Sequence, residues 1–401
     1  MVVFDYFFWI SGGLLLAVMV YLWFLAVVSL IPERTVAITK ESQTRFAILI
    51  PAHNEAAVIR ATLESVKTLD YSEMLYDVIV IADNCTDETA ELARQYEARV
   101  LERKDERERG KGFALQWAFE SLKARGDFAG YDAFVIIDAD TVFDPLFLEA
   151  MNKRIAKGEM AIQGYYDVKN PGASPMASLS YLGFALSRNL RYKGRTSLGW
   201  SSNLLGNGMC FSKEIIRRFG WDATSIVEDM EYAVMLRLNG ITVSFGPEAL
   251  VFAEIPDTFK DSKIQRSRWD IGRFQVRNRY LVQLIKEALR KRDIGYLDMA
   301  MELLIPPFSL FVVLCLILFG LFLSSSFTAI DTLSTMWFTI ILMLVTYILL
   351  GLVKAKTGWR TYINLVYAPF FLMWRVKTVI WGYFAKVGKH WIKTARKDIL
   401  K

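Results

Sequence analysis

The sequence predicts an α/β domain, a mostly parallel sheet flanked by helices, inserted between transmembrane α-helices. Between about residues 44 and 260, short apolar runs alternate with helix-like segments, as in parallel strands joined by crossover helices. Long uncharged stretches lie on both sides of this region. The 401 residues are 53% hydrophobic with a mean hydropathy of +0.26, which is too apolar for an ordinary soluble enzyme.

The membrane helices are predicted from three stretches without charge, residues 6–32, 303–330 and 332–353. Each exceeds the ~20 residues that a helix needs to span a bilayer. The first is expected to be a retained anchor, because it is too long for a signal peptide and has no basic start. Residues 324–333 lack Lys and Arg, whereas basic residues follow the first and third stretches (Arg34, Lys40, Arg45, Lys354, Lys356, Arg360). The positive-inside rule therefore predicts a multi-pass plasma-membrane protein with a cytoplasmic central domain.

Changes in composition divide the chain into five parts. We expect an anchor over residues 1–43, a cytoplasmic domain over 44–260, amphipathic interface helices over 261–298, two transmembrane helices over 299–354 and a basic, aromatic interfacial segment over 355–401. The interface helices place basic residues beside regularly spaced apolar ones, a pattern typical of helices on an anionic membrane surface. Pro306 and Pro307 are expected to kink or break the second span near its start.

Several classes of protein are disfavoured. With three cysteines in no CxxC pairing and only two histidines, a disulfide framework, a zinc site and a Ser-His-Asp triad are not expected. The chain has neither a GxGxxG nor a GxxxxGK[ST] motif, which argues against dinucleotide-binding and P-loop proteins. No nucleic-acid partner is expected.

Within the central domain, strands are predicted at residues 46–50, 77–82 and 133–137, and helices at 54–68, 87–96, 112–124, 146–157 and 230–238. Asp138 and Asp140 directly follow the third strand, at the sheet edge where ligands bind in open α/β folds. Two close carboxylates repel each other unless a cation lies between them. Mg²⁺ or Mn²⁺, which prefers oxygen ligands, is the simplest occupant; two solvated acids are the alternative.

A run of charged residues spans positions 102–111. Its simplest interpretation is a solvated loop. The run ends in Lys111 between two glycines, however, and a lysine in that setting can approach a phosphate closely.

Polar motifs recur in a fixed order along this domain. They are Pro-Ala-His-Asn-Glu at 51–55, Ala-Asp-Asn-Cys-Thr-Asp at 82–87, Asp-Ala-Asp at 138–140, Gly-Asn-Gly-Met-Cys-Phe at 206–211, Glu-Asp at 228–229 and Gln-Arg-Ser-Arg-Trp at 265–269. The set resembles the family 2 glycosyltransferases with a GT-A fold. It is most similar to their membrane-embedded branch, which includes cellulose, hyaluronan, chitin and poly-N-acetylglucosamine synthases. The resemblance covers about residues 46–269.

The resemblance implies a donor site for a nucleotide sugar. Ala52, Asn54, Glu55 and Asp83 would grip the nucleotide, and the Asp83 carboxylate would accept a hydrogen bond from a uracil N–H. Ala82 stands where the family more commonly has Asp, which leaves the details of base recognition open. Asp87 is expected to cap the following helix.

The resemblance also implies a metal site. Asp138 and Asp140 would hold Mn²⁺ or Mg²⁺ on the donor diphosphate, and Lys111 would assist from the loop side.

For catalysis, the resemblance implies that Asp229, with Glu228 beside it, is the general base of an inverting in-line displacement. Val227 replaces the family's usual Thr. The alternative is two acids that favour a helix N-terminus. The backbone at Gly206 and Gly208 would approach the acceptor closely.

The motif at residues 265–269 is expected near the diphosphate and acceptor. There Gln265, Arg268 and Trp269 would bind substrate, Arg268 through its forked guanidinium. An amphipathic interface helix is the other interpretation, and one element can serve both roles.

The sequence therefore predicts a membrane-bound, metal-dependent inverting glycosyltransferase. Its donor is expected to be a UDP-sugar, and its acceptor a polysaccharide or a membrane lipid. Three confident spans are few for a secretion channel, so a channel would require a homo-oligomer or a partner. The alternative from another class is an inactive relative that serves as an assembly subunit of an envelope glycan complex.

Overall fold

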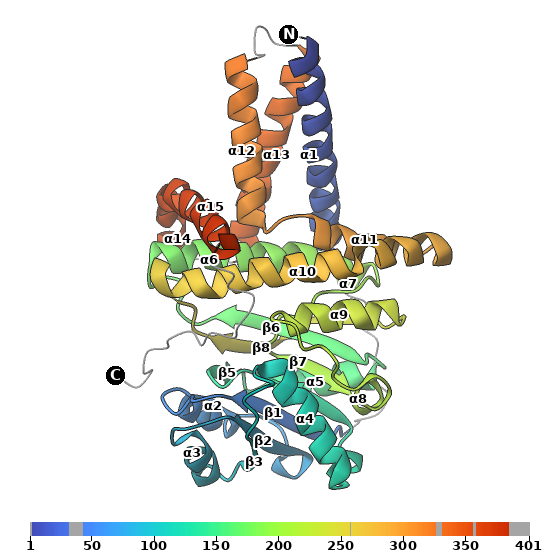
Figure 1. The fold of residues 1–401 in the computed structure, drawn as a ribbon, viewed down its shortest axis with the longest axis vertical. Coiled ribbons are helices and arrows are strands. Elements are labelled where there is room, and N and C mark those ends of the chain that lie inside the picture. Colours follow the sequence, from blue (N-terminus) through green and yellow to red (C-terminus); the bar gives the residue numbers. More distant parts are fainter. Residues whose placement is uncertain (1, 32–42, 257, 326–330, 356–357, 385–401) are drawn as a thin grey trace.

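The computed structural model describes residues 2–31, 43–256, 258–325, 331–355 and 358–384. Helices α1 (Val2–Val28), α12 (Phe308–Ser325) and α13 (Thr332–Ala355) stand upright above an α/β domain. Helices α6 (Pro175–Leu186) and α10 (Phe259–Lys291) lie across the junction between the two parts (Figure 1). The predicted α/β domain between apolar helices is thus confirmed.

An eight-stranded sheet forms the centre of the domain, in the order β3-β2-β1-β4-β7-β6-β8-β5. The strands are β1 (Phe46–Ala52), β2 (Tyr76–Asp83), β3 (Arg99–Arg103), β4 (Ala133–Ile136), β5 (Thr141–Phe143), β6 (Ala161–Val168), β7 (Met209–Ser212) and β8 (Val243–Ala253). Strands β3, β2, β1 and β4 are parallel, as predicted, and so are β6 and β8. Strand β7 is antiparallel to β4 and β6, and β5 to β8, so the whole sheet is mixed.

Helices cover both faces of the sheet and bury a hydrophobic core on each. On one face α4 (Lys111–Ala124) and α9 (Glu228–Leu238) pack with Phe119, Trp221 and Tyr232. On the other, α2 (Ile59–Val66) and α5 (Phe147–Ala156) pack through residues such as Leu63 and Met151. The shorter helices are α3 (Thr89–Gln95), α7 (Lys193–Ser197) and α8 (Lys213–Phe219).

The helix predicted over residues 54–68 begins only at Ile59. Asn54 has a positive φ of 55°, a left-handed conformation that a helix cannot include. Residues 53–58 therefore form a turn that follows β1, and this turn belongs to the site described below.

Among the described residues, four segments are long and apolar enough to cross a bilayer, Phe4–Val28, Phe308–Ser325, Thr332–Ala355 and Trp359–Phe384. Pro306 and Pro307 separate α11 (Ile294–Leu304) from α12, so the expected break is present. The fourth segment contains α14 (Trp359–Asn364) and α15 (Ala368–Phe384).

In Figure 1, α15 lies low beside α10 and α6 rather than among the upright helices. Its buried Arg375 pairs with Asp270 of α10 at 3.0 Å. The predictions that rest on Arg34, Lys40, Lys356 and residues 385–401 lie outside the described residues.

Candidate active site

The parallel strands β1, β2 and β4 end at one edge of the sheet, and the motifs that follow them meet there. The Asn54 side-chain oxygen accepts a hydrogen bond from the Thr86 backbone N–H at 2.7 Å. The Glu55 N–H donates to Thr89 Oγ1 at 2.9 Å. Ala52 is buried at the end of β1. Contacts between the two loops therefore give this edge of the sheet a fixed shape.

Asp87 links the same loops. One of its carboxylate oxygens accepts from the Thr89 N–H at the start of α3, and the other accepts from the Ala56 N–H, both at 3.1 Å. The N-cap of α3 is Glu88, which forms no side-chain cap hydrogen bond, so Asp87 closes the turn into α3 from one residue before the expected cap position. The contact with Ala56 ties Asp87 to the turn after β1.

Asp83, the last residue of β2, forms a buried ion pair with Arg103 of β3. Arg103 Nη1 lies 2.9 Å from Asp83 Oδ1, and the Asn84 side-chain amide donates to the same oxygen at 3.1 Å. Burial raises the pKa of Asp83, and the contact with Arg103 opposes that rise. Among the described residues, the hydrogen bonds from Asn84 and Arg103 are both accepted by Oδ1 of this carboxylate. Oδ2 is thereby left to accept a hydrogen bond from a ligand.

The interpretation of residues 102–111 as a solvated loop is wrong for Arg103, whose side chain is only 4% exposed. Because Arg103 is the last residue of β3 and Asp83 the last of β2, the two parallel strands bring opposite charges together out of water. A run of charged residues does not reveal which member faces inward, so sequence reasoning missed this partner.

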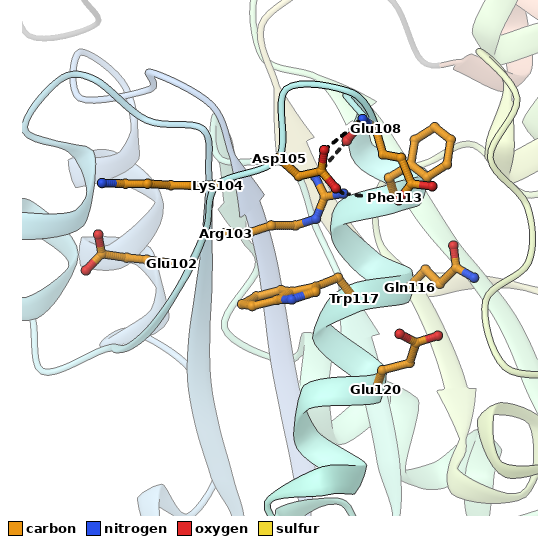
Figure 2. Close-up of a pocket in the computed structure, with 9 residues that line it drawn as sticks. All are labelled: Glu102, Arg103, Lys104, Asp105, Glu108, Phe113, Gln116, Trp117 and Glu120. Atoms are coloured by element: carbon orange, nitrogen blue, oxygen red, sulfur yellow. Dashed lines mark hydrogen bonds and ion pairs between the residues drawn. The ribbon is translucent and has the colours of Figure 1, made fainter.

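A cavity of about 300 Å³ adjoins Arg103 on the side of α4. Figure 2 shows Arg103 and Trp117 extending into this space, with Asp105 and Glu108 bound to the guanidinium. The remaining lining residues are Glu102, Lys104, Phe113, Gln116 and Glu120. None of the carboxylates that surround Lys111 lines the cavity, so it is separate from the cluster described next.

Lys111, the first residue of α4, lies at the centre of a charged cluster. Its Nζ is 2.6 Å from Asp138 Oδ1 and donates to the carbonyl of Gly206. A Cβ on Gly206 would lie 3.2 Å from Asp229 Oδ2 and 3.8 Å from Lys111 Nζ. Gly206 therefore lies within a few ångströms of both Lys111 and the Asp229 carboxylate.

Glu228 and Asp229 open α9 and complete the cluster. Both residues are half-buried, and burial is the main cause that raises the pKa of Asp229 to about 6 and of Glu228 to about 7. The charge of Asp229 adds to the shift at Glu228, whereas Lys111 lowers both pKa values. Burial also opposes the charge on Lys111, but the carboxylates outweigh it and raise the pKa of this lysine.

Asp138 and Asp140 flank a tight turn closed by a hydrogen bond from the Thr141 N–H to the Asp138 carbonyl. Both side chains are half-buried. Within the described part of the chain, no three Asp, Glu, His or Cys side chains lie together as a metal site. The residues thus fit a divalent ion only if a substrate phosphate supplies further oxygen ligands.

Gly206 and Gly208 serve different purposes. Gly208 has φ +68°, and a Cβ there would lie 2.7 Å from Val251 Cγ2, so it permits close packing against β8. Gly206, with φ +77°, is the glycine beside the carboxylates. Of the two glycines, Gly206 is therefore the one whose backbone lies next to the charged cluster.

The loop around Gly206 is held by two amides that sequence reasoning missed. The side-chain amide of Gln163 donates to the Asn207 carbonyl at 2.8 Å, and its oxygen accepts from the Leu205 N–H at 2.7 Å. The Asn207 side-chain oxygen accepts from the Asp138 N–H at 3.2 Å. A glutamine directly after the apolar pair Ala161-Ile162, at the start of β6, was the available signal for Gln163.

Gln265, Arg268 and Trp269 lie half-buried on α10. The Trp269 ring packs edge-on against Phe184 of α6 at 6.1 Å. One turn further, a Cβ on Gly272 would lie 2.6 Å from Val227 Cγ1, so α10 presses against the residue that precedes Glu228. Helix α10 thus lies below the upright helices (Figure 1) and against the residue that precedes Glu228.

The fold and the polar groups at its edge define a glycosyltransferase with the GT-A fold. The structure is similar to the mannosyltransferase PcManGT from Pyrobaculum calidifontis, solved in complex with GDP-Man and Mn²⁺. The TM-score is 0.55 and the identity 16%, with 86% of this chain and 98% of that one covered. Residues 43–272, more than half of the chain, match the sequence model described as "Glycosyltransferase like family 2", and the chain belongs to this family.

Curated relatives carry related names. The chain is 26% identical over 259 residues to the probable glycosyltransferase YdaM of Bacillus subtilis, which covers 62% of this chain and 60% of the relative. It is 27% identical over 239 residues to the poly-beta-1,6-N-acetyl-D-glucosamine synthase of Staphylococcus epidermidis, over 57% of this chain and 55% of the relative. The matches thus span less than two thirds of the length of these relatives.

Proposed function

We propose that this enzyme is a membrane-bound, inverting glycosyltransferase. It transfers a sugar from a UDP-sugar to a glycan or a membrane lipid at the cytoplasmic face of the plasma membrane. The observation that carries the proposal is the cluster of Asp138, Asp229 and Lys111 around Gly206, at the sheet edge where Asp83 ends β2. These residues would supply a base-binding acid, a cation and a proton acceptor at one edge of the sheet.

On the donor side, Asp83 Oδ2 would accept the imide N–H of uracil. The ion pair with Arg103 supports this role, because it fixes the orientation of the carboxylate. Guanine also presents an N–H donor, and the structural relative was solved with GDP-Man. GDP-mannose is therefore the competing donor in the experiment below.

The leaving group is a nucleoside diphosphate, whose negative charge grows as the glycosidic bond breaks. Lys111 would stabilise this charge directly. Asp138 and Asp140 would hold Mn²⁺ or Mg²⁺, which would supply further positive charge to the diphosphate. The Mn²⁺ in the structural relative supports a metal at this position.

On the acceptor side, Asp229 would take the proton from the attacking hydroxyl. With its pKa raised to about 6, Asp229 is mostly ionised at neutral pH, yet it is more basic than an ordinary aspartate. Gln265, Arg268 and Trp269 would line the path of the acceptor, since α10 contacts the loop before Glu228. Attack from this side would invert the anomeric configuration.

The membrane helices support an acceptor that is a lipid or an emerging glycan. The synthase relative favours a polysaccharide. A channel for such a product would require a homo-oligomer or a partner chain.

The test uses the purified full-length protein in lipid nanodiscs. UDP-glucose, UDP-N-acetylglucosamine, UDP-galactose and GDP-mannose are supplied with Mn²⁺, Mg²⁺ or EDTA, and nucleoside diphosphate release is measured. We expect release from one UDP-sugar, and mass spectrometry of the product identifies the acceptor. Turnover of GDP-mannose alone would overturn the UDP assignment, and no turnover with any donor would favour the assembly-subunit alternative.

A further inference from the structure

A buried polar network joins the first membrane helix to the helices beneath it. The Tyr21 hydroxyl of α1 donates to Asp298 Oδ1 of α11 at 2.6 Å and accepts from Arg195 Nη2 of α7 at 2.8 Å. Arg195 Nε also lies 2.9 Å from Asp298 Oδ2. Figure 1 shows the lower end of α1 meeting α11 and the region of α7. A membrane anchor needs only an apolar surface, so these contacts go beyond anchoring.

The network continues through Glu302, one turn further along α11. Its Oε2 lies 2.8 Å from Arg195 Nη2 and 3.1 Å from Arg191 Nη1. Its other oxygen, Oε1, accepts from the side-chain amide of Asn203 at 3.2 Å. Arg195 and Glu302 are each 1% exposed and Asn203 is 2% exposed. Water therefore does not compete for these bonds, and their geometry is strongly constrained.

Asn203 lies three residues before Gly206, on the loop that reaches the catalytic cluster. The Gly206 carbonyl accepts from Lys111 Nζ, and Lys111 binds Asp138. An unbroken series of contacts thus runs from Tyr21 through Arg195 and Glu302 to Asn203, and along this short loop to Lys111. The loop is also held by Gln163, so the network adjusts its position rather than forming it.

The backbones of α1 and α7 are in direct contact, so one helix cannot shift without moving the other. A Cβ on Gly194 of α7 would lie 2.2 Å from the carbonyl oxygen of Leu25 on α1. Helix α1 therefore touches the backbone directly beside Arg195. A displacement of α1 would move Arg195, and with it the partners of Glu302.

We propose that Tyr21 is a positioning residue for glycosyl transfer. Through Arg195 and Glu302 it sets the position of Asn203 and of the loop to Gly206, and hence that of Lys111 beside Asp138 and Asp229. The proposal rests on the proposed function for its catalytic consequence. It makes α1 a part of the catalytic unit rather than an anchor alone.

The matched variants are Tyr21→Phe and Tyr6→Phe. Each removes one tyrosine hydroxyl from α1. Tyr6 is exposed and lies near the opposite end of α1 from Tyr21, so the loss of its hydroxyl should change nothing in the network. The enzyme is studied in nanodiscs, with nucleoside diphosphate release as the assay.

We expect Tyr21→Phe to lower kcat roughly five- to tenfold, because sub-ångström displacement of catalytic groups slows the reaction. The KM for the donor should stay within about twofold, since the donor loops do not contact the network. Tyr6→Phe should match the wild type. Equal kcat values for all three proteins would overturn the proposal, as would a rise in donor KM without a fall in kcat.

A double-mutant cycle tests whether Tyr21 acts through Asn203. Asn203→Ser shortens the side chain that reaches Glu302. If both residues act through one network, the kcat of the double variant should lie within about twofold of the kcat of the slower single variant. Fully multiplicative losses would show independent effects and contradict the proposal.

Hydrogen–deuterium exchange of residues 198–208 provides a readout that needs no activity. Exchange should rise in Tyr21→Phe and stay at the wild-type level in Tyr6→Phe. An unchanged rate in Tyr21→Phe would overturn the positioning role. If the wild type consumes no nucleotide sugar, the proposed function fails, while the exchange experiment still decides whether Tyr21 controls this loop.

Discussion

Lys111 Nζ lies 2.6 Å from Asp138 Oδ1 and also donates to the carbonyl of Gly206, within reach of Asp229. One cation is thus shared between the acid after β4 and the loop next to the proposed base. This arrangement explains why a lysine, rather than a neutral residue, begins α4. Without its charge, the buried carboxylates of the cluster would repel one another.

Replacement of Lys111 tests that role. Lys111→Met removes the charge and keeps most of the side-chain volume, and we expect kcat to fall about 100-fold or more, because a cation at the leaving group is lost. Lys104→Met, at an exposed position of the same loop, is the control and should retain activity. Steady-state nucleotide release measures both. A Lys111→Met enzyme with normal kcat would remove Lys111 from the mechanism.

Gly206→Ala tests the close approach of backbone and carboxylate. The added methyl would meet Asp229 Oδ2 at 3.2 Å in a backbone conformation with φ +77°. Gly199→Ala is a matched control, since Gly199 has φ +71° but no atom within 4 Å of the added Cβ. Both variants should lose similar stability in thermal unfolding, because the backbone strain is similar. Only Gly206→Ala should lose kcat, and equal kcat in the two variants would contradict the crowding argument.

Arg103→Met tests the ion pair behind the donor site. Removing one partner leaves the Asp83 carboxylate buried without its cation, which costs about 3–5 kcal/mol of the free energy of unfolding. The donor KM should rise at least about tenfold, since Asp83 then loses its fixed orientation. Arg107→Met, on the exposed part of the same loop, should change neither quantity. Calorimetric titration with UDP reports the loss directly, and unchanged UDP affinity would separate Asp83 from base recognition.

The pH dependence follows from the raised pKa of Asp229. A general base must be ionised, so kcat/KM should fall as the pH drops below about 6 and level off above it. The raised pKa of Asp229 has the opposite effect on the stability of the fold, which falls as the pH rises. Because the folded-state pKa lies above the ordinary value, the favourable effect of the protonated form is lost as the pH rises through 6. Asp229→Asn should therefore unfold at a higher temperature than the wild type at pH 8, by about 2–4 °C.

Much of the fold was predictable because the parallel strands are continuous apolar runs. Strands β1, β2 and β4 were found in this way, and the polar residues after them were correctly expected at one edge. Strand β5 has only three residues, too short for a hydrophobic pattern to identify. The four residues of β7 begin inside the glycine motif of residues 206–211, which was interpreted only as a substrate contact. The antiparallel pairing of β5 and β7, which makes the sheet mixed, followed only from the structure.

The contacts around the site were harder to predict, because they join residues far apart in the chain. Tyr21 and Asp298 are 277 positions apart, and nothing in either local sequence indicates the other. Arg103 was hidden in a run of charged residues. Lys111, by contrast, was recognisable from its two flanking glycines, and the structure places it at the centre of the cluster.

The central claim is that Asp229 is the base of a glycosyl transfer. The most direct measurement compares single-turnover nucleotide release by the wild type, Asp229→Asn and Asp222→Asn, all in nanodiscs with saturating donor. Asp222 is an exposed aspartate close by in the chain. We expect the single-turnover rate to fall about 10²–10⁴-fold in Asp229→Asn and to stay normal in Asp222→Asn. A wild-type rate in Asp229→Asn would contradict the claim.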